Sequence, residues 1–120
     1  MIGSNLLADQ IANLQDSSGC WNVLDPSDRY FPDLNYYVPN YKSTLWTLVL
    51  LADSLVDPED DRFKKPLQII SDHFYDKENG IFSIGKSHFP IPCLNGNMIY
   101  LLSYFKSDEH DKVRSVVDFF

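Results

Sequence analysis

The sequence predicts an all-α fold, because five segments carry helical periodicity and acidic turns of the kind that start helices lie between them. An internal repeat points the same way, since a period near 50 residues is typical of stacked supersecondary units. The hydrophobic fraction of 44% is large enough to form a core in a chain of 120 residues. We therefore expect helices arranged as antiparallel hairpins, with no sheet beyond a short β-hairpin.

The first two helices are expected at about residues 4–14 and 43–54. Leu7, Ile11 and Leu14 recur at i, i+4 and i+7, which places them on one face of the first helix. The second helix has an apolar face of the same kind, formed by Leu45, Leu48, Val49 and Ala52.

The third helix is expected to open near Phe63, because Pro66 is tolerated only within the first turn of a helix. The acidic turn Asp57–Asp61 precedes it, and carboxylates there can cap free N–H groups at the helix start. Helix capping is therefore the expected role of this turn. The apolar face of the third helix consists of Phe63, Leu67, Ile70 and Phe74.

The fourth helix is expected to begin near Asn95, and the fifth after Asp108. Phe120 lies on the apolar face of the fifth helix, where a following repeat or a second copy of the chain would have to cover it. We therefore expect the chain to belong to a longer array or to self-associate through this face. The apolar positions are Met98, Leu101, Leu102 and Phe105 in the fourth helix, and Val113, Val116, Val117 and Phe120 in the fifth.

The internal repeat emerges when the chain is compared with itself at a shift of 50 residues without gaps. Leu51 then meets Leu101, and Leu55 meets Phe105. The hydrophobic phase is kept across a helix, a turn and a second helix, as expected if each unit buries its apolar face against the next. We interpret the chain as a single helical-repeat domain over residues 1–120. Its repeats would span about residues 1–55, 56–105 and, incomplete, 106–120.

Composition excludes several classes of partner. The formal charge of −7 and the scattered distribution of the ten Lys and Arg residues argue against nucleic acid, which requires clustered positive charge. The longest apolar run, Leu48–Ala52, is far shorter than the roughly 18 residues of a transmembrane helix. Cys20 and Cys93 do not form a disulfide framework, so a cytoplasmic location is expected.

A short motif follows the first helix. Gln15, Gly19 and Trp21 form a Q-x-x-x-G-x-W string, which resembles the QW motif of squalene and hopene cyclases. A degenerate copy, Asp76–Phe82, closes the third helix, with Phe in place of Trp and no Gln. The motif is expected to be structural: Gln15 can bond a neighbouring helix end, Gly19 permits the turn and Trp21 stacks over it.

Two further segments, Tyr41–Leu48 and Pro92–Ile99, look like the inner-helix starts of prenyltransferase and squalene-oxidase repeat proteins. The resemblance implies a partial α/α toroid, in which the first, third and fifth helices are outer and the other two face a central cavity. It also implies a hydrophobic, isoprenoid-like small molecule as the substrate. The candidates to line the cavity are Tyr41, Trp46, Tyr100 and Tyr104.

The chain departs from these families at the positions that carry chemistry. Asp57–Asp61 lacks the D-x-D-D spacing of the cyclase acid, and no zinc set is recognisable, so neither a metal site nor a cofactor is assigned. Cys93 opens the fourth helix, where a thiolate would be favoured, and His88 in the preceding loop could pair with it as a nucleophile or ligand. The alternative, which we favour, is that Cys93 is a small buried residue at a crowded helix start.

Two functions therefore remain open. One is an enzyme segment that holds an isoprenoid-like substrate in a cavity, with unidentified catalytic residues. The other is a non-catalytic helical-repeat module with a binding or structural role, since a fold does not by itself fix a function.

Overall fold

The computed structural model describes residues 2–21, 43–84 and 88–120, and over these residues the chain is helical apart from one short hairpin. This confirms the prediction of a predominantly α-helical fold. Strands β1 and β2 pair antiparallel, with Tyr75 opposite Phe82 and Asp76 opposite Ile81. The described elements are α1 (Ile2–Ala12), α3 (Thr44–Asp53), α4 (Asp61–Phe74), β1 (Tyr75–Asp76), β2 (Ile81–Phe82), α5 (Pro92–Tyr104) and α6 (His110–Phe119).

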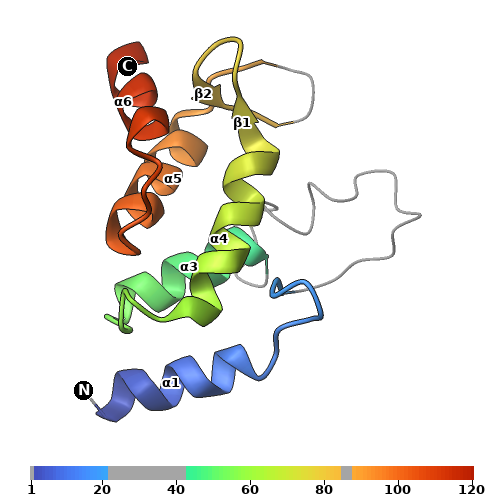
Figure 1. The fold of residues 1–120 in the computed structure, drawn as a ribbon, viewed down its shortest axis with the longest axis vertical. Coiled ribbons are helices and arrows are strands. Elements are labelled where there is room, and N and C mark those ends of the chain that lie inside the picture. The colour runs from blue at the N-terminus through green and yellow to red at the C-terminus, as the bar shows by residue number, and fades with distance from the viewer. Residues whose placement is uncertain (1, 22–42, 85–87) are drawn as a thin grey trace.

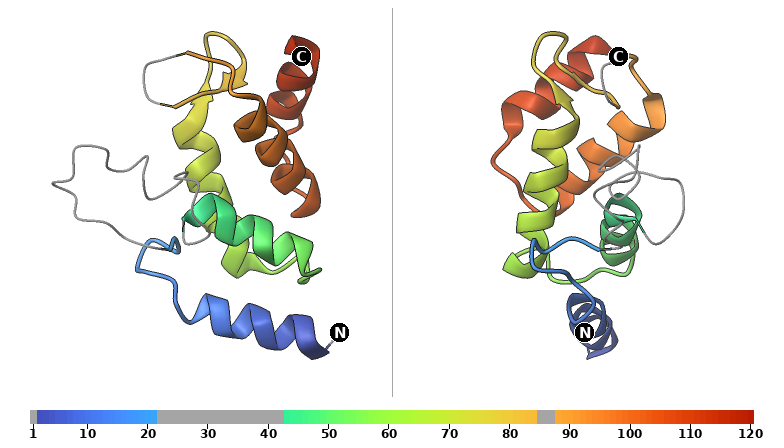
Figure 2. Two further views of the ribbon diagram at one scale, coloured as in Figure 1. Left: turned by 180° about the vertical axis from the view of Figure 1, so that it is seen from behind. Right: turned by 90° about the vertical axis from the view of Figure 1, so that its right-hand side faces the viewer.

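The helices follow one another along the long axis of the molecule, with α1 and α6 at opposite ends (Figure 1). Helix α3 packs against both α4 and α5, and α5 packs in turn against α4 and α6. Strand β2 contacts α5 and α6, so the hairpin lies at the same end as these two helices (Figure 2). Helices α3, α4 and α5 therefore pack on one another, and α6 joins them through α5.

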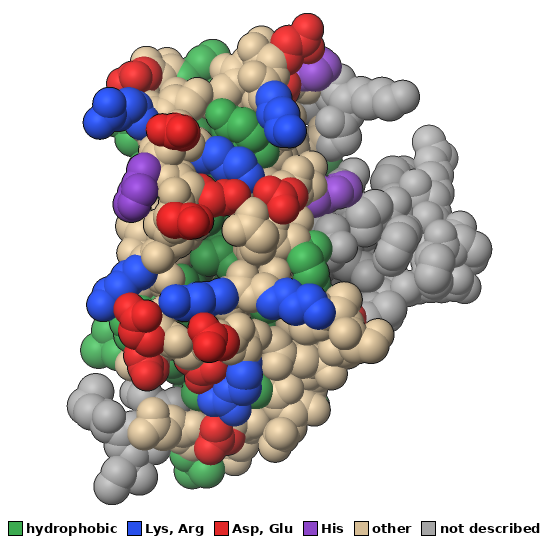
Figure 3. All heavy atoms as spheres, in the orientation of Figure 1, with side chains coloured by type: hydrophobic (Ala, Val, Ile, Leu, Met, Phe, Trp, Pro, Cys, Tyr) green, Lys and Arg blue, Asp and Glu red, His purple; other side chains and the backbone are tan. Residues whose placement is uncertain are grey.

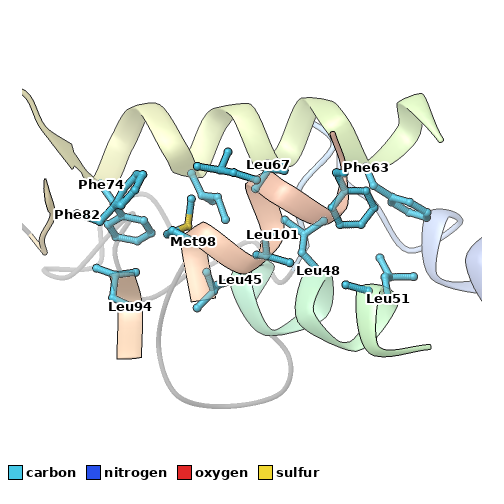
Figure 4. Packing of buried hydrophobic residues seen from close by; sticks show 14 of the residues in the cluster. Leu45, Leu48, Leu51, Phe63, Leu67, Phe74, Phe82, Leu94, Met98 and Leu101 are labelled. Atoms are coloured by element: carbon cyan, nitrogen blue, oxygen red, sulfur yellow. The ribbon is translucent and has the colours of Figure 1, made fainter. Parts of the chain in front are cut away.

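The core forms where three helices meet. Figure 4 shows Met98 of α5 lying between Leu67 of α4 and Leu45 of α3. Helix α3 is buried at six of its ten residues, whereas α4 is amphipathic and presents its charged positions to solvent. On the face drawn in Figure 3, acidic and basic side chains alternate over α4 and α6.

Pro66 lies inside α4, and the expectation that this helix opens near Phe63 was wrong. The helix begins at Asp61, and the Asp60 side chain accepts from the Arg62 N–H at 3.1 Å, which confirms capping by the acidic turn. Pro66 has no N–H to donate to the carbonyl of Arg62, four residues earlier. The Gln15 side chain donates to that carbonyl instead, at 2.8 Å. A donor from a distant segment thus allows a proline beyond the first turn.

The turns after α3 and α5 correspond at a shift of 51 residues, one more than the shift of 50 used in the sequence comparison. Leu55 and Lys106 both have positive φ, and the residue after each donates back into its helix, Val56 to the Leu51 carbonyl and Ser107 to the Leu102 carbonyl. Equivalent turn residues are therefore 51 apart. The pairing of Leu55 with Phe105 does not hold, because Leu55 is 62% exposed and Phe105 is fully buried.

The helix starts also differ from expectation. Helix α5 begins at Pro92, three residues before Asn95, because proline suits the first helical position, where its missing N–H has no intrahelical acceptor. Helix α1 spans Ile2–Ala12, two residues earlier than expected at each end.

Candidate functional site

The Q-x-x-x-G-x-W turn joins α1 to α4. The Gln15 amide donates both to the Gly19 carbonyl at 2.7 Å and to the Arg62 carbonyl at 2.8 Å. Gly19 has a φ of +92°, a conformation that favours glycine. Its α-carbon faces Pro66, whose Cδ would lie 3.6 Å from an added Cβ. The turn therefore closes over the proline of α4 and satisfies the carbonyl that this proline leaves free.

Trp21 is buried in the core, as expected for a structural motif. Its indole N–H donates to the Ile11 carbonyl at 2.8 Å, and its ring lies 6.1 Å from the ring of Phe63. The backbone N–H of Trp21 donates to the Thr44 hydroxyl, which donates to the Trp21 carbonyl, both at 3.2 Å. Trp21 is thus fixed to α1, α4 and the start of α3.

The degenerate copy of the motif makes the same kind of connection to α5. The backbone N–H of Phe82 donates to Asn95 Oδ1 at 2.8 Å, and Asn95 Nδ2 donates to the Phe82 carbonyl at 2.9 Å. Thr44 and Asn95 are both buried in the first turn of a helix and lie 51 residues apart. We call these two pairs of contacts the reciprocal hydrogen bonds.

Sequence reasoning missed the role of Thr44 and Asn95, because the segments that separate them from Trp21 and Phe82 differ in length. The signal available was a polar side chain in an otherwise apolar first turn, found at nearly the same shift as the repeat.

The second turn also packs onto the following helix, α6. The Ser115 hydroxyl of α6 donates to the Gly80 carbonyl at 2.8 Å. A Cβ on Gly80 would lie only 2.0 Å from that hydroxyl oxygen, and Gly80 has a φ of +68°. Glycine is therefore required in the second turn by close packing as well as by conformation.

The described aromatic residues that were predicted to line a cavity differ in their contacts. Tyr100 donates to Asp53 Oδ1 at 2.7 Å, and this hydrogen bond raises the pKa of Tyr100 to about 12. Tyr104 donates to the Val56 carbonyl. Both hydroxyls therefore tie α5 to the end of α3. Trp46 is half-buried, and its indole N–H is buried without an acceptor in the part of the chain that the structure describes, whereas Tyr41 lies outside that part.

His88 is paired with Asp76 of the hairpin. Its Nδ1 lies 2.6 Å from Asp76 Oδ2, and Asp76 raises the pKa of His88. Hydrogen bonds from Asn79 and His88 lower the pKa of Asp76 to about 2. Cys93 is exposed in the first turn of α5.

The hairpin also contains the groups best suited to hold a metal. Asp76, Glu78 and His88 each offer a ligand atom, and these atoms lie within 4.8 Å of one another. Two carboxylates and an imidazole suit a divalent cation. A cation there would have to displace the hydrogen bond between His88 and Asp76.

A Ser–Lys pair between α4 and α6 does not form a nucleophile. Lys112 Nζ lies 3.1 Å from the Ser71 hydroxyl and 2.9 Å from Glu109 Oε1. Although burial opposes it, hydrogen bonds to Glu109 and Asp72 raise the pKa of Lys112. The amine therefore stays protonated and cannot accept a proton from Ser71, which is fully buried. The hydrogen bonds of Lys112 to Ser71 and Asp72 instead join α6 to α4.

An apolar groove of about 310 Å³ lies between α5 and α6. Its floor is open at Gly96, where an added Cβ would meet no atom within 4 Å. Val117 on α6 and Phe120, which follows the helix, are more than half exposed at its edge. A larger hollow of about 510 Å³ on α6 is lined instead by charged residues such as Asp111, Arg114 and Asp118. The residues that line the apolar groove are Pro92, Asn95, Gly96, Ile99, Val116, Val117 and Phe120.

Comparison of the chain with protein-family models, curated proteins and solved structures found no match. Within the described ranges, no helix is both long enough and apolar enough to cross a membrane. Among the described residues, the apolar groove and the cluster of Asp76, Glu78 and His88 are the two candidates considered for ligand binding.

Proposed function

We propose that the chain is a segment of a helical-repeat protein, related in plan to the prenyltransferase and squalene-oxidase repeats, and that it works as a binding scaffold for apolar partners. The observation that carries this proposal is the repetition of the reciprocal hydrogen bonds. Trp21 with Thr44 and Phe82 with Asn95 each join a glycine-containing turn to the start of the next helix. A connection used twice is what a protein built from one repeated unit requires.

The burial of the helices supports the same plan. Helix α3 and the core-facing side of α5 are mainly apolar, whereas α4 and α6 are amphipathic. This alternation is expected if inner and outer helices alternate along the chain. Each unit of a repeat protein buries its apolar face against the next. The groove between α5 and α6 is such a face, and its size and lining suit an apolar partner.

The geometry favours binding over catalysis for the described residues. The hydroxyls of Tyr100 and Tyr104 are engaged in hydrogen bonds to the end of α3, and the amine of Lys112 is held protonated. A reducing cytoplasm remains the proposed compartment, since Cys20 is buried and Cys93 is exposed, and neither is in a disulfide.

A second candidate partner is a small isoprenoid-like molecule. The observation that favours it is the volume of the groove, because about 310 Å³ falls within the range of roughly 300–1,000 Å³ that is usual for small-molecule pockets. Ile99, Val116 and Phe120 would then contact the hydrocarbon.

Fluorescence of an environment-sensitive hydrophobic dye tests the scaffold proposal. Dye should bind the unmodified chain saturably, and Val117→Asp should reduce the signal several-fold, because it introduces a charge at the edge of the groove. Leu6→Asp is the matched control, because Leu6 is also an exposed aliphatic residue but lies on α1 at the other end of the molecule. Equal dye binding by all three proteins would contradict the proposal.

A further inference from the structure

We propose that Asp76, Glu78 and His88 form a binding site for a zinc ion, which joins the β-hairpin to the segment that leads into α5. This inference goes beyond the proposed scaffold function and does not depend on it, because none of the three residues lines the apolar groove. Two observations support it. The ligand atoms of three residues converge from separate segments, and the two carboxylates have no counterpart in the first glycine-containing turn.

The three ligand atoms come from two segments that the fold brings together. Asp76 ends β1 and Glu78 lies in the turn of the hairpin, whereas His88 precedes α5. The segment that leads from His88 into α5 runs beside the hairpin (Figure 2). One ligand atom from each residue lies within 4.8 Å of the other two, and His88 Nδ1 lies 2.6 Å from Asp76 Oδ2. Folding therefore adds an imidazole to two carboxylates.

These spacings are close to those of a coordination shell. Zinc holds nitrogen and oxygen ligands at about 2.0–2.2 Å, so two ligands at tetrahedral positions lie roughly 3.3 Å apart. His88 Nδ1 and Asp76 Oδ2 therefore separate by about 0.7 Å to admit the ion. The side chain of Glu78 is exposed on the turn, where it can rotate to complete the set of three ligands.

Asp76 is already oriented as a ligand. Its Oδ1 accepts from the backbone N–H groups of Glu78 at 3.0 Å and Asn79 at 3.3 Å. The Asn79 amide donates to Oδ2 at 2.7 Å. Such hydrogen bonds to a ligating carboxylate are usual in metal sites, because they fix its orientation. The side chain of Asp76 is 8% exposed and that of His88 is 52% exposed, so an ion can reach the carboxylate from the side of His88.

The two turns differ at the positions that supply the carboxylates. When the turns are aligned on their glycines, Asp76 and Glu78 stand where the first turn has Gln15 and Ser17. Both differences place an acid where the first turn has a neutral side chain. A feature that the turn needs for its own conformation would be expected in both copies. The pair of carboxylates therefore belongs to the second turn alone.

The structural role of Gln15 also has no counterpart in the second unit. Gln15 donates to the Arg62 carbonyl, which Pro66 leaves without a backbone donor. Helix α6 has Val116 at the position that corresponds to Pro66, and valine has a backbone N–H. A side chain without donor hydrogens is therefore tolerated at Asp76, where it can serve as a ligand.

The ligand set selects among cations. Imidazole suits zinc and related transition metals, whereas calcium and magnesium prefer oxygen ligands throughout. One nitrogen and two carboxylate oxygens therefore favour zinc. Three protein ligands also leave a fourth tetrahedral position, which water or a group from another molecule can fill.

Isothermal titration of the full 120-residue chain with zinc chloride, after treatment with a chelator, tests this inference. We expect one saturable site per chain. Calcium and magnesium should bind about tenfold more weakly or less tightly still. Cobalt should give visible absorption bands that zinc abolishes, without the charge-transfer band that a thiolate ligand produces.

Two variants locate the site, and two matched controls exclude other ligands. His88→Asn and Glu78→Gln should each weaken zinc binding about tenfold or more. Asparagine suits the positive φ of His88, and both side chains are exposed, so circular dichroism should show unchanged helices. The controls are His110→Gln and Cys93→Ser, which replace an exposed histidine and an exposed cysteine elsewhere and should leave zinc binding unchanged.

Four results would overturn the inference. They are the absence of saturable zinc binding, binding that both His88→Asn and Glu78→Gln leave intact, an equal loss of binding in either control, and calcium binding as tight as that of zinc. None of these results bears on the scaffold proposal, which the binding of hydrophobic dye at the groove tests separately.

Discussion

The groove between α3 and α4 is covered by another helix, whereas the groove between α5 and α6 is open. The wall residues compared in the two grooves lie 50 residues apart in the sequence. In the first, α5 covers Leu67 and Ile70, and the wall is part of the core. In the second, Val117 and Phe120 face solvent. Burial in this chain therefore depends less on the residue type of a wall position than on whether a further helix packs on it.

The two turns that close these units show a smaller difference. The first ends in Trp21, whose ring and indole N–H contact α4 and α1, whereas the second ends in Phe82, which packs edge-to-face against Tyr75 of the hairpin. Both make reciprocal hydrogen bonds to the next helix. The backbone connection is thus conserved between the units, while the aromatic ring is adapted to its neighbours.

Replacement of Trp21 or Phe82, the aromatic residues that end the two turns, should change the free energy of unfolding most. Trp21→Ala should lower the free energy of unfolding by about 3–5 kcal/mol, because it removes a large buried ring and leaves a cavity. Phe82→Ala should cost a similar amount if the two turns are equivalent. Chemical denaturation measures both, and unchanged stability in Trp21→Ala would contradict the structural role of the motif.

The corresponding wall residues give the sharpest contrast. Ile70→Ala should cost about 2–5 kcal/mol, as expected for a fully buried aliphatic side chain. Phe120→Ala removes a larger side chain but should change stability by only about 0.5 kcal/mol, because the ring is mostly exposed. The denaturation midpoints of the two variants measure this difference. A greater loss of stability in Phe120→Ala than in Ile70→Ala would contradict it.

Gln15 should contribute through the proline of α4. Gln15→Ala should cost about 1 kcal/mol, because the Arg62 carbonyl loses its donor. In a Pro66→Ala background, the new backbone N–H can reach that carbonyl, so the same change should cost less. A double-mutant cycle measures this coupling, and simple additivity would show that the two residues act independently.

Gly96 gives the smallest expected effect, in the opposite direction. Gly96→Ala should stabilise the chain by about 0.5–1 kcal/mol, because glycine weakens a helix interior and the added methyl group meets no atom. Gly80→Ala is the contrasting variant and should destabilise, since its Cβ would collide with Ser115. A thermal melt that ranks the two in the reverse order would refute this account of the open groove.

The helices themselves could be predicted from periodicity, because each apolar stripe is local in the sequence. The bounds of α3 and the start of α6 lie within one residue of those expected, but the starts of α1, α4 and α5 were misplaced. The start of α4 depends on Gln15, which supplies the donor that Pro66 lacks, and that contact joins residues 47 positions apart. The one-residue offset at Leu55 and Lys106 is likewise a property of turn geometry that a gapless comparison does not detect.

The candidate site was less predictable than the fold. His88 was considered as a partner of Cys93 because the two are close in sequence, whereas its contact with Asp76 of the hairpin was not predicted. Tyr100 and Tyr104 were expected to face a cavity because they are aromatic and lie on a helix that the family resemblance would make an inner one. Their hydroxyls find acceptors at the end of α3, since α5 packs against that helix.

The sequence by itself determined which residues can form helices, where glycine is needed and which faces are apolar. These are properties of short segments, governed by backbone conformation and by the spacing of side chains. Only the tertiary structure decided which apolar faces are covered. Leu67 and Val117 occupy equivalent positions and differ in burial because α5 packs on the first, while no described residue packs over the second. Coverage depends on which helices pack together, and the sequence of a short segment does not contain that information.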